Sequence, residues 1–423
     1  MRRGVHTRGM ASDEADPLAW TRDYTPILRS LAAEYGESKP LDGDTVALAS
    51  HLETKTGVLV ETLRAAGARV LVTGSEPYST KGAVVEALGA IEGVETFVEA
   101  GMSEEDWEAG QHDLLAEGPD FILDDGCELI AKVHADHPDI AETVVGGGEQ
   151  TTAGITRVEA MADQDVLRFP VYGVNDTPMK HYFDNVHGTG ESTLTNVLST
   201  TNTMLSGKTV VVAGYGYCGR GIARKARGMG AWTVVTEVDP RKALEAVMDG
   251  HRVTSMAEAA PRADYVITST GNREVVRREH IERLQDGVVL ANAGHFDVEI
   301  AVEDLDELAE DVTRPKAGIT RYHLPDGRRV NLLARGRLVN LTGPHSEGHP
   351  AEVMDTTFAM MFAAARDMLT REPDLVPGLY PIPDHLDREV ADRKLETLGI
   401  TIDSLTESQR EYREDWEHPD SSF

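Results

Sequence analysis

Four short segments of the chain carry side chains that could transfer protons or hold a small polar ligand. They combine His, Lys, Asp, Glu and amide residues and lie at residues 50–56, 124–126, 149–152 and 180–185. Such side chains are the usual general acids and bases of enzymes. Each segment also has an ordinary structural explanation. In residues 180–185, for example, a Lys and an Asp four residues apart usually form a surface ion pair. The segments therefore indicate one site only if the fold brings them together.

A glycine-rich run at residues 213–221, AGYGYCGRG, has the G-x-G-x-x-G spacing of dinucleotide-binding loops. β-branched residues precede it, a helical pattern follows it, and Glu237 stands about 20 residues further on. Gly214 allows a tight turn, Gly216 lets the backbone approach a pyrophosphate, and Gly219 lets the helix pack closely on the strand. Glu237 can accept hydrogen bonds from ribose hydroxyls and would repel a 2′-phosphate, so we expect NAD rather than NADP.

Short apolar runs and helical patterns alternate along the chain and would position these groups. We expect strands at 69–73, 94–98, 120–123, 143–145, 209–213, 232–236, 265–268 and 288–291. We expect helices at 44–66, 190–205, 220–229 and 351–369, a proline-rich connector at 372–383 and a charged helical tail. Such alternation is typical of parallel sheets covered by helices, whose sites lie at the carboxyl ends of strands. Because Asp124 and Asp125 follow a strand directly, one of them should project from that edge.

The sequence therefore predicts an α/β protein with two doubly wound parallel-sheet domains. A substrate domain would comprise residues 1–189 and 349–377, and an inserted Rossmann NAD domain residues 190–348. A short helical tail, residues 378–423, would follow them.

The net charge of −31 over 423 residues restricts the possible partners. It argues against nucleic acid, whose phosphates would be repelled. An acidic surface stays hydrated in concentrated salt, so we expect a salt-adapted cytoplasm, although a merely acidic protein is the alternative. No apolar run approaches the roughly 18 residues that span a bilayer, and Arg2 and Arg3 lack the apolar stretch of an export signal. Cys127 and Cys218 form neither a disulfide framework nor a zinc pattern, and no metal is expected.

In this order the segments resemble one family, the adenosylhomocysteinases (S-adenosyl-L-homocysteine hydrolases), in an archaeal form. The resemblance extends from residue 24 to residue 416. Besides the glycine loop, the matching motifs are FDN at 183–185, GES at 190–192, TEVDP at 236–240, NAGHFDVEI at 292–300, GRLVNL at 336–341 and GHPAEVMD at 348–355.

The resemblance implies reversible cleavage of S-adenosyl-L-homocysteine to adenosine and L-homocysteine. The ribose 3′-hydroxyl is transiently oxidised with NAD, homocysteine is eliminated, water adds, and the 3′ carbon is reduced again. Lys180 and Asp184 would hold the ribose hydroxyls, with Lys180 taking the 3′ proton and Asn185 supporting both. Asp125 and His51 would handle protons at C4′ and at the leaving sulfur or incoming water.

Further roles also follow from the resemblance. His295 and His349 would line the side that holds homocysteine and water. The residues expected near NAD, besides the glycine loop and Glu237, are Thr151, Thr152, Asn185, Asn292 and Asn340. Family members are typically tetrameric, so we expect a cytoplasmic homo-oligomer with hinges near residues 185–191 and 340–349.

The chain departs from the family pattern where the purine would be read. Glu53 stands where the family has Thr and Lys55 where it has Glu. Hypoxanthine offers a donor at N1 and an acceptor at O6, the reverse of adenine, so this pair would suit S-inosyl-L-homocysteine. Alternatively, Glu53 and Lys55 pair with each other and adenine is read by the backbone. Gln150, a further expected substrate contact, replaces a usual Glu, and Lys81 with Gly82 replaces Gln-Asp.

Two other functions stay open. An ordinary NAD dehydrogenase would explain the glycine loop but would leave the first 185 residues without a purpose. A catalytically weak paralogue that binds NAD and a nucleoside would explain the departures, but the joint presence of His51, Asp125, Lys180 and Asp184 argues against it.

Overall fold

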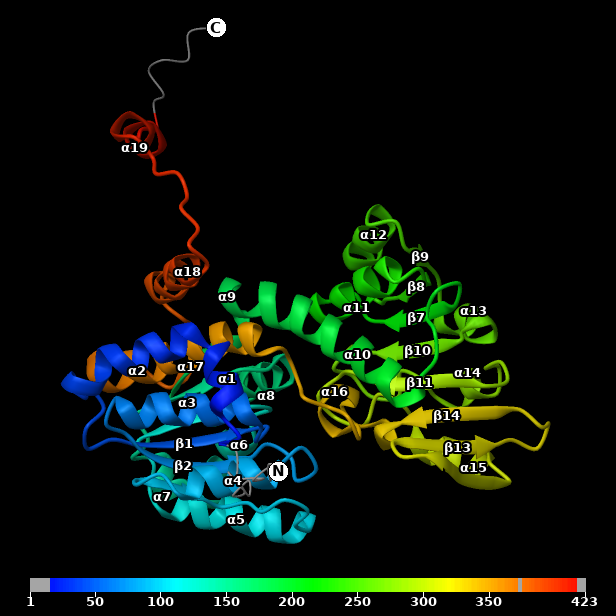
Figure 1. Ribbon diagram of the computed structural model, residues 1–423, viewed down its shortest axis with the longest axis horizontal. Coiled ribbons are helices and arrows are strands. Elements are labelled where there is room, and N and C mark those ends of the chain that lie inside the picture. Colours follow the sequence, from blue (N-terminus) through cyan, green and yellow to red (C-terminus); the bar gives the residue numbers. More distant parts are fainter. Residues whose placement is uncertain (1–15, 372–374, 417–423) are drawn as a thin grey trace, which may run out of the picture.

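The computed structural model describes residues 16–371 and 375–416. Two α/β units face each other, each built on one sheet (Figure 1). The first sheet has the order β15-β6-β5-β4-β1-β2-β3 and is parallel throughout. Its strands are β1 Thr45–Ser50, β2 Arg69–Gly74, β3 Val94–Thr96, β4 Phe121–Asp124, β5 Gly146–Glu149, β6 Pro170–Gly173 and β15 Gly378–Pro381.

The second sheet has the order β12-β13-β14-β11-β10-β7-β8-β9. It is parallel except that β13 runs antiparallel to both of its neighbours. Its strands are β7 Thr209–Ala213, β8 Trp232–Thr236, β9 Arg252–Val253, β10 Tyr265–Thr268, β11 Val288–Asn292, β12 Asp311–Lys316, β13 Ile319–His323 and β14 Arg329–Leu333.

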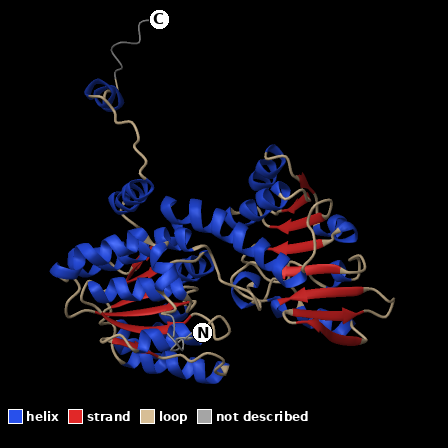
Figure 2. Ribbon diagram, in the orientation of Figure 1, coloured by secondary structure: helices blue, strands red, loops and turns tan. Residues whose placement is uncertain are grey.

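Helices flank both sheets (Figure 2). Those of the first unit are α1 Ala19–Asp23, α2 Pro26–Ser38, α3 Thr54–Ala65, α4 Gly82–Gly89, α5 Glu104–Ala116, α6 Glu128–Asp136, α7 Pro138–Ala141, α8 Thr152–Asp163, η1 Val174–Asp176, α9 Pro178–Lys180, the π-helix η2 His181–Gly188 and α17 Ala351–Arg371. Those of the second unit are α10 Thr189–Thr201, α11 Tyr217–Gly228, α12 Pro240–Met248, α13 Met256–Ala259, η3 Ala260–Arg262, α14 Arg278–Ile281, α15 Val302–Leu308, η4 Ala334–Gly336 and α16 Val339–Thr342. The chain ends with α18 Asp384–Leu398 and α19 Glu407–Glu414, which lies apart from the body (Figure 1).

Both sheets are doubly wound, which confirms the predicted fold class. In the first sheet the winding direction reverses between β1 and β4, and in the second it reverses between β7 and β10. Ligands bind outside the carboxyl ends of the strands at such switch points. The segments that follow these four strands are therefore the ones that the topology places at a site.

Three expected elements were wrong. Residues 45–50 form β1 instead of the start of a helix, because the strand is buried on both faces and shows no alternation. The strand expected at 143–145 lies three residues later, in the glycines of β5. A Cβ at Gly146 would lie 3.2 Å from Sδ of Met368, so the glycine lets α17 pack closely against this strand. Part of the expected connector pairs with β6 as β15, so the chain returns to the first sheet.

Candidate active site

A cleft of about 840 Å³ lies between the carboxyl edges of the two sheets. It collects side chains from all four polar segments and from the glycine loop. The predicted site residues that line it are His51, Glu53, Asp125, Gln150, Thr151, Thr152, Lys180, Asp184, Asn185, Gly214, Gly216, Glu237, His295, Asn340 and His349. Lys55, Gly219 and Asn292 do not line it.

Lys180 lies at the floor of the cleft, where α9 passes into the π-helix η2. Its Nζ donates to Oδ1 of Asn185 at 2.6 Å and to Oδ1 of Asn175 at 3.1 Å, and lies 3.5 Å from Oδ1 of Asp184. The wider turn of the π-helix puts Asp184 and Asn185 on one side, next to the amine. Asn175, buried after β6, was not anticipated, although it belongs to a polar run that directly follows a strand.

Asp184 is held from three directions. Thr357 of α17 donates to its Oδ2 at 2.7 Å, and Nδ1 of His349 lies 3.1 Å from its Oδ1. Burial would raise the pKa of Asp184, but the charge of Lys180 and the contacts from His349 and Thr357 hold that pKa well below its usual range. Asp184 is therefore a carboxylate, an acceptor suited to a ribose hydroxyl.

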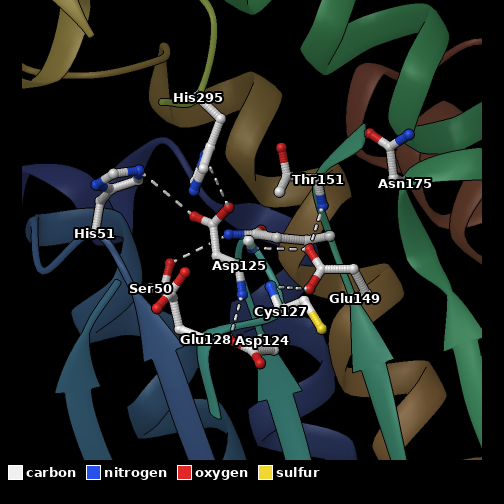
Figure 3. Close-up of polar contacts among 12 residues, drawn as sticks. Ser50, His51, Asp124, Asp125, Cys127, Glu128, Glu149, Thr151, Asn175 and His295 are labelled. Atoms are coloured by element: carbon white, nitrogen blue, oxygen red, sulfur yellow. Dashed lines mark hydrogen bonds and ion pairs between the residues drawn. The ribbon is translucent and has the colours of Figure 1, made fainter. Parts of the chain in front are cut away.

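Asp125 lies between two imidazoles that come from different domains (Figure 3). Nε2 of His51 is 3.6 Å from its Oδ2, and Nδ1 of His295 is 3.8 Å from its Oδ1. Burial lowers the pKa of His51 to about 4, so this ring is neutral near pH 7. The loop must be tight here, because a Cβ at Gly126 would lie 2.4 Å from Nε2 of His295. The three groups can exchange protons with a ligand in the cleft.

Asp124 and Glu149 hold the backbone behind Asp125. Asp124 accepts from the amides of Asp125 and Ile130, and Glu149 accepts from the amides of Gly126, Cys127 and Thr151. Burial raises the pKa of Asp124 to about 7 and that of Glu149 well above its usual range. Thus Asp125 is the aspartate that projects into the cleft, and Asp124 turns the chain. The sequence did not distinguish these roles.

Glu53 and Lys55 form a buried ion pair at one end of the cleft. The Nζ of Lys55 also contacts the carbonyl of Glu347, and Lys81 donates to the carbonyl of Ser346 at 2.8 Å. These lysines, both departures from the family pattern, hold the loop before His349. Burial raises the pKa of Glu53, while the charge of Lys55 opposes that shift. In this structure Glu53 and Lys55 pair with each other, and Glu53 faces the cleft.

Gln150 also lines the cleft and carries an unsatisfied polar atom. Its amide nitrogen donates to Oγ of Ser50 at 3.3 Å, while its Oε1 is buried without a partner. A buried acceptor with no donor is costly unless a ligand supplies one. Gln150 therefore fits the substrate contact that the sequence predicts.

The glycine loop has the space that a dinucleotide needs. A Cβ at Gly216 would meet no atom within 4 Å, which leaves the start of α11 open to a pyrophosphate. A Cβ at Gly219 would lie 2.0 Å from the carbonyl oxygen of Gly214, so this glycine serves helix packing. Glu237 accepts from the amide of Tyr215 at 2.7 Å and still lines the cleft. Oδ1 of Asn340 is buried without a partner, which suits an amide donor on a cofactor. These residues fit NAD.

Asn292 does not line the cleft, and its side chain bonds within its own loop. Its Oδ1 accepts from the amide of Gly294 at 2.8 Å, and its Nδ2 donates to the carbonyls of Gly294 and Phe296. It shapes the loop that presents His295. Glu299, which the sequence did not single out, accepts from the amides of Thr270 and Gly271 and so supports a neighbouring wall of the cleft. Its position in the GHFDVEI motif could have marked it as a site residue.

The two sheets, the glycine loop and the shared cleft define a two-domain NAD-binding enzyme. A family model described as "S-adenosyl-L-homocysteine hydrolase, NAD binding domain" matches residues 185–346, and one described as "S-adenosyl-L-homocysteine hydrolase" matches residues 17–138. The chain belongs to the S-adenosyl-L-homocysteine hydrolase family, which confirms the resemblance seen in its motifs.

Relatives with two different activities in their names are similar to the chain over nearly its whole length. An S-inosyl-L-homocysteine hydrolase from Methanopyrus kandleri is 49% identical over 414 residues, which cover 98% of this chain and 97% of the relative. An adenosylhomocysteinase from Haloquadratum walsbyi is 49% identical over 401 residues, covering 95% and 93%. One from Pyrococcus abyssi is 46% identical, covering 97% and 96%.

Proposed function

We propose that this protein is an adenosylhomocysteinase, which reversibly hydrolyses S-adenosyl-L-homocysteine to adenosine and L-homocysteine with tightly bound NAD. The observation that carries the proposal is the shared cleft. It places the Lys180 and Asp184 pair, the Asp125 and His51 pair and the NAD loop around one volume of about 840 Å³. An ordinary dehydrogenase would need one proton-transfer group, and not both the Lys180 and Asp184 pair and the Asp125 and His51 pair.

Lys180 and Asp184 would act on the ribose. Asp184 accepts a hydrogen bond from a ribose hydroxyl, and the Nζ of Lys180 lies beside it to take the 3′ proton. Asn175 and Asn185 fix that amine by accepting two of its hydrogens. Bound NAD would supply reversible oxidation at the 3′ carbon, which acidifies the neighbouring C4′ hydrogen.

Asp125, His51 and His295 would act on the other side of the sugar. His51 is neutral near pH 7 and can accept a proton, while the carboxyl of Asp125 lies within 4 Å of both imidazoles. This group can remove the C4′ proton and deliver one to the departing sulfur. Because His295 follows β11 and Asp125 follows β4, the group is complete only when the two domains meet.

The test is a thiol assay with purified protein and S-adenosyl-L-homocysteine. We expect release of free homocysteine thiol, retention of NAD by the protein, and no lasting rise in reduced-cofactor absorbance. Accumulation of reduced cofactor without thiol would indicate an ordinary dehydrogenase. A protein that binds NAD and nucleoside but yields neither signal would be a non-catalytic paralogue.

Glu53 and Lys55 favour a second candidate substrate, S-inosyl-L-homocysteine. Glu53 faces the cleft as an acceptor, which suits the N1 hydrogen of hypoxanthine, and Lys55 behind it holds that carboxylate in place. Comparing kcat/KM for the two nucleosides decides between them. If hypoxanthine is preferred, the double variant Glu53→Thr with Lys55→Glu should shift the ratio toward the adenosyl compound. An unchanged ratio would show that the backbone reads the base.

We further infer a salt-adapted cytoplasmic homotetramer in which the C-terminal segment contacts another copy of the chain. No residue of α19 is buried, and Trp416 is 85% exposed. Within the described residues no helix has both the length and the apolar character to traverse a bilayer. Light scattering should give four times the chain mass for the full protein, and a smaller mass after removal of residues 400–423.

A further inference from the structure

Arg337 reaches from the second unit to the first, outside the residues that line the cleft. Its guanidinium carbon lies 3.6 Å from the ring centre of Tyr78, and its Nη2 lies 3.3 Å from Oε1 of Glu104. The hydroxyl of Tyr78 donates to the same oxygen of Glu104 at 3.0 Å. The cation therefore covers an aromatic face and pairs with a carboxylate that this ring also holds, and both partners belong to the first unit.

The same side chain holds the loop that carries His295. Nε of Arg337 lies 3.3 Å from Oδ2 of Asp297, two residues after His295. His295 itself points into the cleft, where its Nδ1 lies 3.8 Å from Oδ1 of Asp125 in the first unit (Figure 3). The loop thus meets the first unit directly through His295 and indirectly through Arg337.

The backbone that presents Arg337 has an uncommon conformation. Two successive residues before it, Ala334 and Arg335, have φ of 49° and 58°. Non-glycine residues rarely adopt positive φ, and such backbone persists where the surrounding structure requires it. Just after Arg337, an isolated bridge pairs Leu338 with Asn292, at the end of β11, where the His295 loop begins. The turn therefore fixes this arginine beside that loop.

We propose that Arg337 is a positioning residue that fastens the His295 loop to the first unit when the cleft is closed. The inference rests on the proposed function, in which His295 and Asp125 belong to one proton-transfer group. That group is complete only when the two units meet. Arg337 joins them because it contacts Asp297 in its own unit and Tyr78 in the other.

The contacts of Arg337 differ in whether they survive opening of the cleft. Its ion pair with Asp297 lies within one unit, so it persists when the units separate to admit a ligand. Its contacts with Tyr78 and Glu104, which we call the clasp, join different units and must break. A cation–π contact and an ion pair near the surface are each weak. A clasp of this strength favours the closed cleft and still lets it open in each turnover.

The first experiment measures kcat/KM for thiol release by the full protein with NAD bound. Arg337→Met removes the charge and should lower kcat/KM by roughly 5- to 30-fold, the combined effect of a cation–π contact and weak ion pairs. Tyr78→Ala should lower it by roughly 2- to 5-fold, whereas Tyr78→Phe keeps the ring and should stay within about 2-fold of the wild type. Arg335→Met is the matched control, because it removes the same charge from an exposed side chain of the same turn, and it should leave kcat/KM unchanged.

A double-variant cycle tests whether the loss arises from the contact between the units. If Arg337 acts through Tyr78, the combination of Arg337→Met with Tyr78→Ala should lose no more than Arg337→Met alone. Additive losses would show that the two side chains act independently and would overturn the proposal. An equal loss in Arg335→Met, or a wild-type kcat/KM in Arg337→Met, would overturn it as well.

The second experiment needs no turnover and so separates this inference from the proposed function. Amide hydrogen exchange of residues 75–81 and 293–299, with NAD bound and no substrate, should be faster in Arg337→Met than in the wild type or in Arg335→Met. The melting temperature serves as the control for folding. If the wild type releases no thiol, the proposed function is wrong, whatever the exchange shows. If the wild type releases thiol and Arg337→Met exchanges at the wild-type rate, only the role of Arg337 is refuted.

Discussion

Lys180 and Asp184 form a pair of opposite charges in the cleft, and their side chains are largely removed from water. Lys180 is 5% exposed and Asp184 is 4% exposed. Removing one partner of such a pair leaves an uncompensated buried charge, which is strongly destabilising. Substitutions here must therefore be judged by activity and by stability together.

Lys180→Ala should lower kcat by roughly 10²- to 10⁴-fold, the usual contribution of a positioned acid or base. The affected step is ribose oxidation, because Lys180 Nζ is 3.5 Å from Asp184 Oδ1, where a ribose hydroxyl would bind. Rapid mixing that follows reduced cofactor measures this step directly. The NAD content and melting temperature of the variant serve as controls, and full turnover in Lys180→Ala would contradict the role.

His51 should make the protein less stable in acid. Its pKa falls from 6.5 to about 4 on burial, so below pH 6.5 the unfolded chain takes up a proton that the folded chain refuses. The cost grows as pH falls and reaches about 2 kcal/mol near pH 5, at about 1.4 kcal/mol per pKa unit. Denaturant unfolding of the wild type and of His51→Gln between about pH 7 and about pH 5 measures the difference. Identical pH dependence in both proteins would count against this burial.

Glycines allow close packing between elements of this protein at several positions. Gly146 beneath α17 and Gly219 in α11 are two of them. At Gly219 the constraint comes from the backbone of the adjoining loop, whereas at Gly216 no protein atom lies near. The two glycines of the cofactor loop therefore have separable physical roles.

Alanine substitutions should separate the two roles. Gly216→Ala, at a φ of −69° with nothing within 4 Å, should leave the apoprotein's melting temperature unchanged but weaken NAD binding. Gly219→Ala places a methyl group against the carbonyl of Gly214 and should cost about 1–3 kcal/mol of folding stability as well. Calorimetry of the apoproteins and NAD titration measure the two effects. Equal melting temperatures for both variants would contradict this assignment.

The molecule as a whole is strongly acidic, yet its cleft depends on contact between two domains. The chain has a net charge of −31, so its many carboxylates repel one another at low ionic strength. Contacts such as Lys81 to the carbonyl of Ser346 and Arg337 to Glu104 join the two sides. Screening of the net charge should therefore favour the closed, folded molecule.

Salt should raise the melting temperature. Between about 0.1 M and about 2 M KCl the Debye length falls from roughly 10 Å to less than 3 Å, which removes most long-range repulsion. We expect an increase of at least about 4 °C, which corresponds to roughly 3–4 kcal/mol for a protein of this size. Scanning calorimetry in KCl checks it, with an equal osmolality of sucrose as the control. A constant or falling melting temperature in KCl would contradict salt adaptation.

Much of the fold and site could be read from local patterns. The β-branched run and glycine spacing at residues 209–221 indicated the cofactor loop, because each glycine there answers a local backbone requirement. Polar residues directly after strands indicated the site, because parallel strands bring their carboxyl ends to one edge. Almost every predicted site residue lines the cleft for this reason.

Other features depended on contacts between segments far apart in the chain. The glycines of β5 carry no strand propensity, and they form a strand because β4 and β6 pair with them under α17. Asp124 and Asp125 are adjacent and chemically identical, and only the neighbouring amides and imidazoles distinguish their roles. Local propensity acts within a few residues, whereas strand pairing and burial arise where distant segments meet.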